Sequence, residues 1–148
     1  LGPGSLMPRR LEANELVAVP SNAREVSDSP EQSQTTSATF VEMKAITISF
    51  PGAYRFKYVA RREGSTTKSW TVELRRNGTR VGQVHDTSTS NNFIVYIEDK
   101  GGWKAGDSAA VYGKIDDGET LTVANFVILG EYSYRFPAIT PGKITKAS

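Results

Sequence analysis

The chain of 148 residues has no cysteine and a single histidine. The absence of cysteine excludes disulfides, thiolate metal sites and cysteine nucleophiles. The formal net charge is only +2, from 18 Lys and Arg against 16 Asp and Glu, so the basic surface expected of a nucleic-acid-binding protein is not predicted. No run of about 18 apolar residues occurs, and insertion into a membrane is therefore not predicted either.

Composition and turn-forming residues divide the chain into four parts. The opening Leu-Gly-Pro-Gly-Ser is typical of a cleaved-tag remnant, so residues 1–6 are set aside and Met7 is the expected natural start. Residues 7–35 are polar and are predicted to form an N-terminal arm. Residues 36–136 form the predicted β-sandwich domain, and residues 137–148 a flexible C-terminal tail.

The arm contains one stretch with regular structure. Residues 15–19, Glu-Leu-Val-Ala-Val, favour a short strand that Pro20 halts. A short helix over residues 11–17 is the alternative, and the strand is preferred because the rest of the chain has strand patterns.

Residues 70–84 are predicted to form a β-hairpin around Asn77 and Gly78. Both central residues of a type I′ turn need positive φ, which Asn and Gly tolerate best. A two-residue turn fixes the facing pairs as Arg76 with Thr79, Arg75 with Arg80, and Leu74 with Val81. The apolar residues of the first strand then share one face: Trp70, Val72 and Leu74.

Further strands follow from apolar alternation. The alternation over residues 40–50 changes phase, which predicts a β-bulge near Lys44 to Ile46. Other predicted strands cover residues 54–60, 93–97, 109–115, 121–129 and 131–136. About eight strands and no convincing helix predict an all-β fold, an antiparallel, jelly-roll-like sandwich in one domain.

The chain also contains an internal sequence repeat. Gly52 and Gly106 lie 54 positions apart, and the same offset relates Tyr58 to Tyr112. This spacing predicts two three-strand pseudo-repeats that build the two facing halves of the sandwich. The turn residues recur in both repeats, whereas the polar residues differ between them. This is typical of a scaffold, so no enzymatic activity is predicted.

The polar residues show no catalytic or metal-binding constellation. His85 stands beside Asp86, but neighbouring strand residues point to opposite faces, so His85 is expected to be an exposed loop residue. The carboxylate pairs Glu98-Asp99 and Asp116-Asp117 lack the ligand spacing of a calcium loop. We therefore expect no catalytic residue, no metal site and no cofactor.

Aromatic residues supply the candidate binding sites. Trp103 lies in a Gly-Gly-Trp-Lys stretch, where an exposed indole would stack on a sugar ring, and it is the candidate ligand-binding residue. The alternative is that Trp103 plugs the open end of the sandwich. Tyr132, Tyr134 and Phe136 alternate near the end and are the candidate interface with a partner subunit.

Five motifs combine into a recognisable pattern. They are the Ser/Thr-rich approach and strand at 31–48, Tyr-Arg-Phe-Lys-Tyr at 54–58, the Asn-Gly hairpin at 72–82, Gly-Trp-Lys-Ala-Gly-Asp at 102–107, and Val-Ala-Asn-Phe-Val-Ile at 123–128. This pattern resembles a β-sandwich module of virion proteins of tailed bacteriophages, such as tail appendages and capsid decorations, that also occurs in some bacterial surface proteins.

The resemblance implies a non-enzymatic structural or attachment protein of a phage-like virion. It implies a homo-oligomer, with a trimer favoured, bound to other virion proteins and located in the extracellular virion. The alternative is a carbohydrate-binding module that recognises a cell-surface glycan, on a secreted or cell-surface protein.

Overall fold

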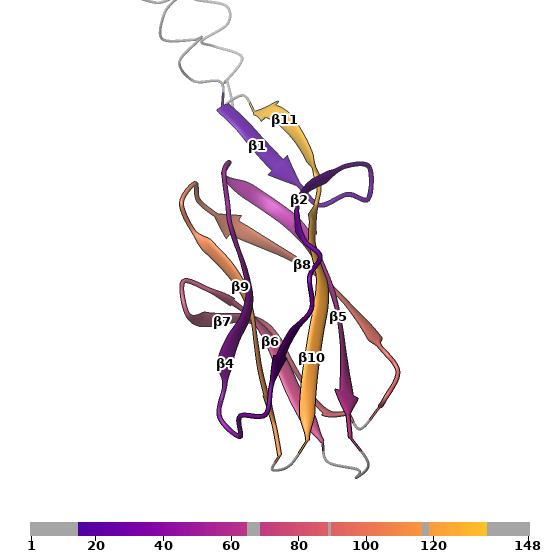
Figure 1. Ribbon diagram of the computed structural model, residues 1–148. Helices are drawn as coiled ribbons and strands as arrows, with labels where there is room; N and C mark the ends of the chain where they lie inside the picture. Colours follow the sequence, from indigo (N-terminus) through magenta and orange to yellow (C-terminus); the bar gives the residue numbers. More distant parts are fainter. Residues whose placement is uncertain (1–14, 65–68, 89, 117–118, 136–148) are drawn as a thin grey trace, which may run out of the picture.

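The computed structural model describes residues 15–64, 69–88, 90–116 and 119–135, which form two packed β-sheets (Figure 1). The larger sheet contains β1 (Glu15–Val19), β2 (Glu25–Ser29), β3 (Ser33–Thr35), β5 (Gly52–Glu63), β8 (Ile94–Trp103), β10 (Thr120–Leu129) and β11 (Glu131–Arg135). The smaller sheet contains β4 (Val41–Thr47), β6 (Trp70–Arg76), β7 (Thr79–Ser88) and β9 (Ser108–Ile115). The all-β sandwich is confirmed, with eleven strands in the described residues where about eight were expected.

The additional strands come from residues 15–35, which were expected to form an arm with one short strand. Strand β1 confirms the preference for a strand over a helix. Strands β2 and β3 both pair with β10, so this segment extends the larger sheet. Neither strand was predicted, because both are polar and half-buried at most, and their place depends on backbone pairing with β10.

The core lies between the inner faces of the two sheets. The predicted alternation along β5 is confirmed, because Tyr54, Phe56 and Tyr58 are fully buried. The predicted inner face of β6 is confirmed as well, with Trp70, Val72 and Leu74 buried against them.

The β6–β7 hairpin has the predicted turn but a different register beyond it. Asn77 and Gly78 have φ of 50° and 86°, as a type I′ turn requires. The pairs nearest the turn are as predicted, Arg76 with Thr79 and Arg75 with Arg80. The pair of Leu74 with Val81 was wrong, because the register shifts and Glu73 pairs with Val84. At this irregularity β7 also receives a contact from β8: Gln83 N donates a hydrogen bond to Glu98 Oε1 over 2.9 Å.

The predicted bulge in β4 exists but lies slightly earlier. The register with β9 shifts between Glu42 and Lys44, around Met43. Met43 and Ile46 both point into the core as a result, whereas Ala45 is exposed. The phase change in the apolar alternation therefore predicted the bulge correctly, and only the predicted position of the bulge was wrong.

The two predicted repeats do not each build one sheet. The middle strand of the first repeat, β5, lies between β8 and β10 of the second, and β9 lies between β4 and β6 of the first. Val41 pairs with Gly113, and the 54-residue offset carries this pair onto Val95 and Val59, which also pair. The repeats thus exchange their middle strands across the sandwich.

Candidate functional site

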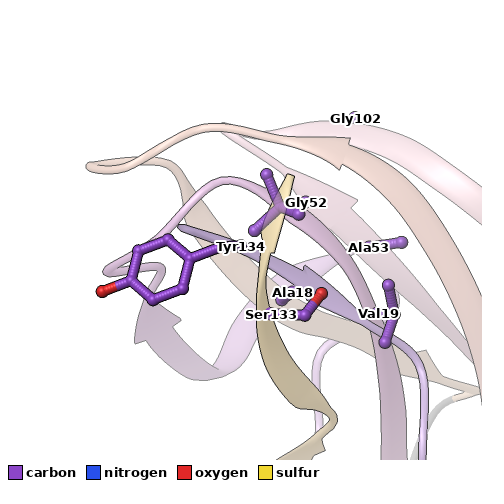
Figure 2. Close-up of a pocket in the computed structure, with 8 residues that line it drawn as sticks. Ala18, Val19, Gly52, Ala53, Gly102, Ser133 and Tyr134 are labelled. Carbon is purple, nitrogen blue, oxygen red and sulfur yellow. The ribbon is translucent and has the colours of Figure 1, made fainter. Parts of the chain in front are cut away.

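A hollow of about 440 Å³ opens at the end of the sandwich where the β1–β11 ribbon meets β5 (Figure 2). Small residues form much of its lining: Ala18, Gly52, Ala53, Gly102 and Ser133. Val17, Val19 and Tyr134 complete the lining, and none of these side chains carries a charge. The hollow is therefore an uncharged, largely apolar site that is open to solvent.

Two strands approach each other closely beside the hollow. Ala18 of β1 pairs in parallel with Gly52 of β5, and Ala18 N donates a hydrogen bond to Pro51 O over 2.9 Å. Gly52 has a φ of 134°, and a Cβ on it would lie 2.3 Å from Ala18 O. Only glycine fits this position.

The three candidate interface aromatics have different surroundings. Tyr132 packs edge-to-face on Phe50, with ring centroids 5.0 Å apart, and on Tyr54, at 6.4 Å. Tyr134 is 68% exposed and stands at the rim of the hollow, with its ring to one side in Figure 2. Phe136 lies outside the described residues. Of the two described tyrosines, Tyr134 is the one that presents a free ring face.

Burial affects the chemistry of the neighbouring Tyr54. Its hydroxyl donates a hydrogen bond to Phe50 O over 2.5 Å. Burial, with a further contribution from Tyr132, raises the pKa of Tyr54 well above its ordinary value. Tyr54 is therefore a neutral packing residue beneath the β1–β11 ribbon and not a proton donor or acceptor for a ligand.

Trp103 is only 2% exposed, so it is placed as a plug and not as a ligand platform. Its ring packs on Phe56 at 5.0 Å, and the Arg76 guanidinium lies 5.4 Å above it. Its Nε1–H donates a hydrogen bond to Lys100 O over 3.1 Å. No ring face remains for a sugar to stack on. The glycine before it, Gly102, borders the hollow instead.

His85 is not the exposed loop residue that the sequence suggested. It lies on β7, largely buried, with Nε2 3.3 Å from Glu98 Oε2 of β8. Its ring stacks on Tyr96 at 4.2 Å. No sequence pattern signals this contact, because it joins strands of two different sheets. The pair covers the seam between β7 and β8 beside the buried Tyr58.

The carboxylate pairs do not converge on one point. The Glu98 carboxylate accepts a hydrogen bond from β7. The Asp99 carboxylate accepts two hydrogen bonds from the Arg55 guanidinium, over 2.8 and 3.0 Å, and these lower the pKa of Asp99. Asp117 lies outside the described residues. Among the residues that the structure describes, no three His, Asp or Glu side chains gather where they could hold a metal ion. The described part of the chain also forms no helix with the length and apolar character needed to cross a membrane.

No protein-family model matches the sequence, and no curated protein does. Among solved structures, the chain is similar to the C-terminal domain of EclA, which is described as a sugar-binding protein. The TM-score is 0.48 and the sequence identity 14%, over 77% of this chain and 84% of that chain.

Proposed function

We propose that this β-sandwich is a non-enzymatic carbohydrate-binding module whose site is the hollow at the β1–β11 ribbon. The observation that carries the proposal is the 68% exposed ring of Tyr134 at the rim of an open hollow of about 440 Å³. An aromatic ring offers an apolar face on which the C–H face of a sugar ring packs. A volume of this size is in the range of small-ligand sites.

The rest of the lining suits the same ligand. The small side chains of Ala18, Ala53 and Gly102 let a ligand approach the backbone closely, and the Ser133 hydroxyl lies beside them as a hydrogen-bonding group. No charged side chain lines the hollow within the described residues. We therefore expect a neutral saccharide and not an anionic one.

The test is binding of neutral mono- and oligosaccharides on a glycan array, followed by calorimetry for the best ligand. Tyr134→Phe keeps the ring, so it should bind within a few fold of wild type, whereas Tyr134→Leu keeps an apolar side chain without the ring. Loss of one stacking contact should weaken binding about tenfold or more. Ala53→Gln, which fills the hollow, should abolish binding. Unchanged affinity in Tyr134→Leu and Ala53→Gln, or no saccharide bound by wild type, would overturn the proposal.

A structural or attachment component of a phage-like virion is the second candidate. The observation that favours an assembly role is a row of exposed apolar side chains on β8, at Val95 and Ile97. The trimer, the virion partners and the virion location stay predictions from the resemblance of the sequence. Light scattering of the full chain tests the oligomeric state, and a stable trimer would support an assembly role.

A further inference from the structure

Asn77 and Gly78, the central residues of the β6–β7 turn, form the one Asn-Gly pair in the sequence. Asparagine before glycine is the pair that deamidates fastest, because glycine leaves its backbone nitrogen unhindered. That nitrogen attacks Cγ of the asparagine and closes a five-membered succinimide ring. The Cγ–Nδ2 bond breaks, and the Gly78 amide proton departs with the ammonia. Solvent water then opens the ring, and both residues are exposed to it.

The folded chain ties the Asn77 carboxamide to the start of β9. Its Nδ2 donates to Asp107 Oδ1 over 3.0 Å, and its Oδ1 accepts from Ser108 N over 2.8 Å. The backbone uses the same partner, since Asn77 N donates to Ser108 O over 2.9 Å. These bonds continue the β6–β9 ladder beyond its last pair, Arg76 with Ala109. Both polar atoms of the carboxamide are therefore engaged.

Asp107, the acceptor for Nδ2, is itself held in place. Its Oδ2 accepts from Lys104 N over 2.9 Å, and its backbone carbonyl accepts from Ile48 N over 2.8 Å. The hydrogen bonds from Asn77 and from Lys104 N hold the pKa of Asp107 below its ordinary value, so Asp107 is ionised at neutral pH. A hydrogen bond to an ionised acceptor is stronger than one between neutral groups.

The conformation of the turn opposes ring closure as well. The succinimide contains Cα, Cβ, Cγ and the carbonyl carbon of Asn77 together with Gly78 N. Cβ and that nitrogen must therefore lie on the same side of the Cα–C bond. In a type I′ turn the first central residue has a ψ of about 30°, which places the next nitrogen on the side opposite Cβ. The ring cannot close until this bond rotates.

We propose that Asn77 is a deamidation site that its contacts with Asp107 and Ser108 protect, and that local opening of this end of the hairpin exposes. The rotation that ring closure requires separates the carboxamide from both partners. The reaction rate in the folded protein is therefore set by how often this contact opens, and not by unfolding of the whole sandwich.

The products of the reaction cannot form the same contact. Ring opening at the N–Cγ bond leaves an aspartate at position 77, in which an oxygen without a hydrogen replaces Nδ2 opposite Asp107. Two carboxylates then face each other where a donor faced an acceptor. Ring opening at the other carbonyl leaves an isoaspartate, whose side-chain methylene enters the main chain and lengthens the two-residue turn. Either product loosens the turn from β9.

The first experiment follows deamidation of residue 77 in the full chain, by digestion and mass spectrometry after incubation at neutral pH. Native wild type should react about tenfold or more slowly compared with the same chain in urea. Asp107→Ala should speed the reaction of the folded protein about tenfold, the factor for one hydrogen bond to a charged group. Val123→Ala is the matched control and should react near the wild-type rate. It removes buried atoms from β10 in the other sheet, so it lowers overall stability without touching the turn.

Three results would overturn the proposal. The first is an equal rate for native wild type and the chain in urea, which would mean that the fold gives no protection. The second is an Asp107→Ala that reacts no faster than wild type. The third is an equal acceleration by Val123→Ala, because global unfolding would then control the reaction.

A second experiment tests the contact without relying on Asp107→Ala to fold. Asn77→Asp reproduces one product, and it should lower the urea midpoint at neutral pH. Adding Asp107→Asn should restore most of the loss, because the exchanged pair again sets a donor opposite an acceptor. The exchange also keeps acceptors for Ser108 N and Lys104 N. Equal midpoints for wild type and Asn77→Asp, or no recovery in the double variant, would contradict the clash with Asp107.

Discussion

Arg62 and Glu119 form an ion pair enclosed within the sandwich. Arg62 Nη1 lies 3.3 Å from Glu119 Oε1, and the two side chains are 6% and 1% exposed. The same Nη1 also lies 3.3 Å from Gly64 O. Gly64 has a φ of 144°, and a Cβ on it would overlap the Glu119 carboxylate. The pair therefore fixes the end of β5 against the start of β10.

Removal of one member of this pair should destabilise the fold strongly. Arg62→Met leaves the Glu119 carboxylate buried without its cation, which costs about 3–5 kcal/mol. The double variant Arg62→Met with Glu119→Gln should recover much of this loss, because no charge then remains buried. Urea denaturation measures both. Equal midpoints for wild type and Arg62→Met would show that the carboxylate is compensated in another way.

Trp103→Ala should lower stability and leave the ligand site functional. The substitution removes a buried indole that packs on Phe56, with an expected cost of about 3–5 kcal/mol. Trp103→Phe should cost less, because it keeps one aromatic ring and loses the five-membered ring of the indole with its hydrogen bond to Lys100 O. The measurement is the free energy of unfolding together with saccharide affinity. A stable Trp103→Ala that no longer binds saccharide would instead make Trp103 a ligand residue.

The side chain of Asn77 links the hairpin turn to β9, and two substitutions separate its roles. Its Nδ2 donates to Asp107 Oδ1 over 3.0 Å, and its Oδ1 accepts from Ser108 N over 2.8 Å. Asn77→Gly keeps the positive φ and loses these bonds, at about 1 kcal/mol for each bond. Asn77→Ala should cost about 1 kcal/mol more, because alanine resists the left-handed conformation. Equal unfolding midpoints of the two variants would contradict the φ argument.

Asp107 should make the fold weaker in acid. Hydrogen bonds from Asn77 and from Lys104 N hold the pKa of Asp107 below its ordinary value of 3.8. Because the folded pKa is the lower one, this carboxylate stabilises the fold above about pH 4. The contribution disappears as the pH falls through the folded pKa.

Urea midpoints between pH 2 and pH 6 test this expectation. Asp107→Asn removes the titrating group, so its stability should fall less than that of wild type on acidification. Carboxyl NMR of wild type gives the pKa directly. An Asp107 that titrates above 3.8 would contradict the sign of the effect.

The sequence predicted the parts of the fold that depend on neighbours along the chain. The type I′ turn at Asn77 and the buried alternation along β5 were correct, because φ preference and two-residue periodicity are local properties. The phase change around Met43 also signalled its bulge. The register at Leu74 was missed, because the turn type fixes only the pairs beside the turn and the register shifts beyond them.

The candidate site was predicted only in part. Tyr134 was identified as an exposed aromatic, but its neighbours in the hollow were not. Trp103 was weighed as a ligand residue, and its burial became evident only from the position of Phe56. No sequence pattern predicted the contact of His85 with Glu98, because the two residues belong to different sheets.

The sequence by itself therefore determined an all-β sandwich, the turn at Asn77 and Gly78, and the buried faces of β5 and β6, because φ preference and alternate burial are local properties. Only the tertiary structure decided where the hollow opens and which aromatic borders it. The reason is physical: the hollow is lined by residues of β1, β5, β8 and β11, and these strands are far apart along the chain.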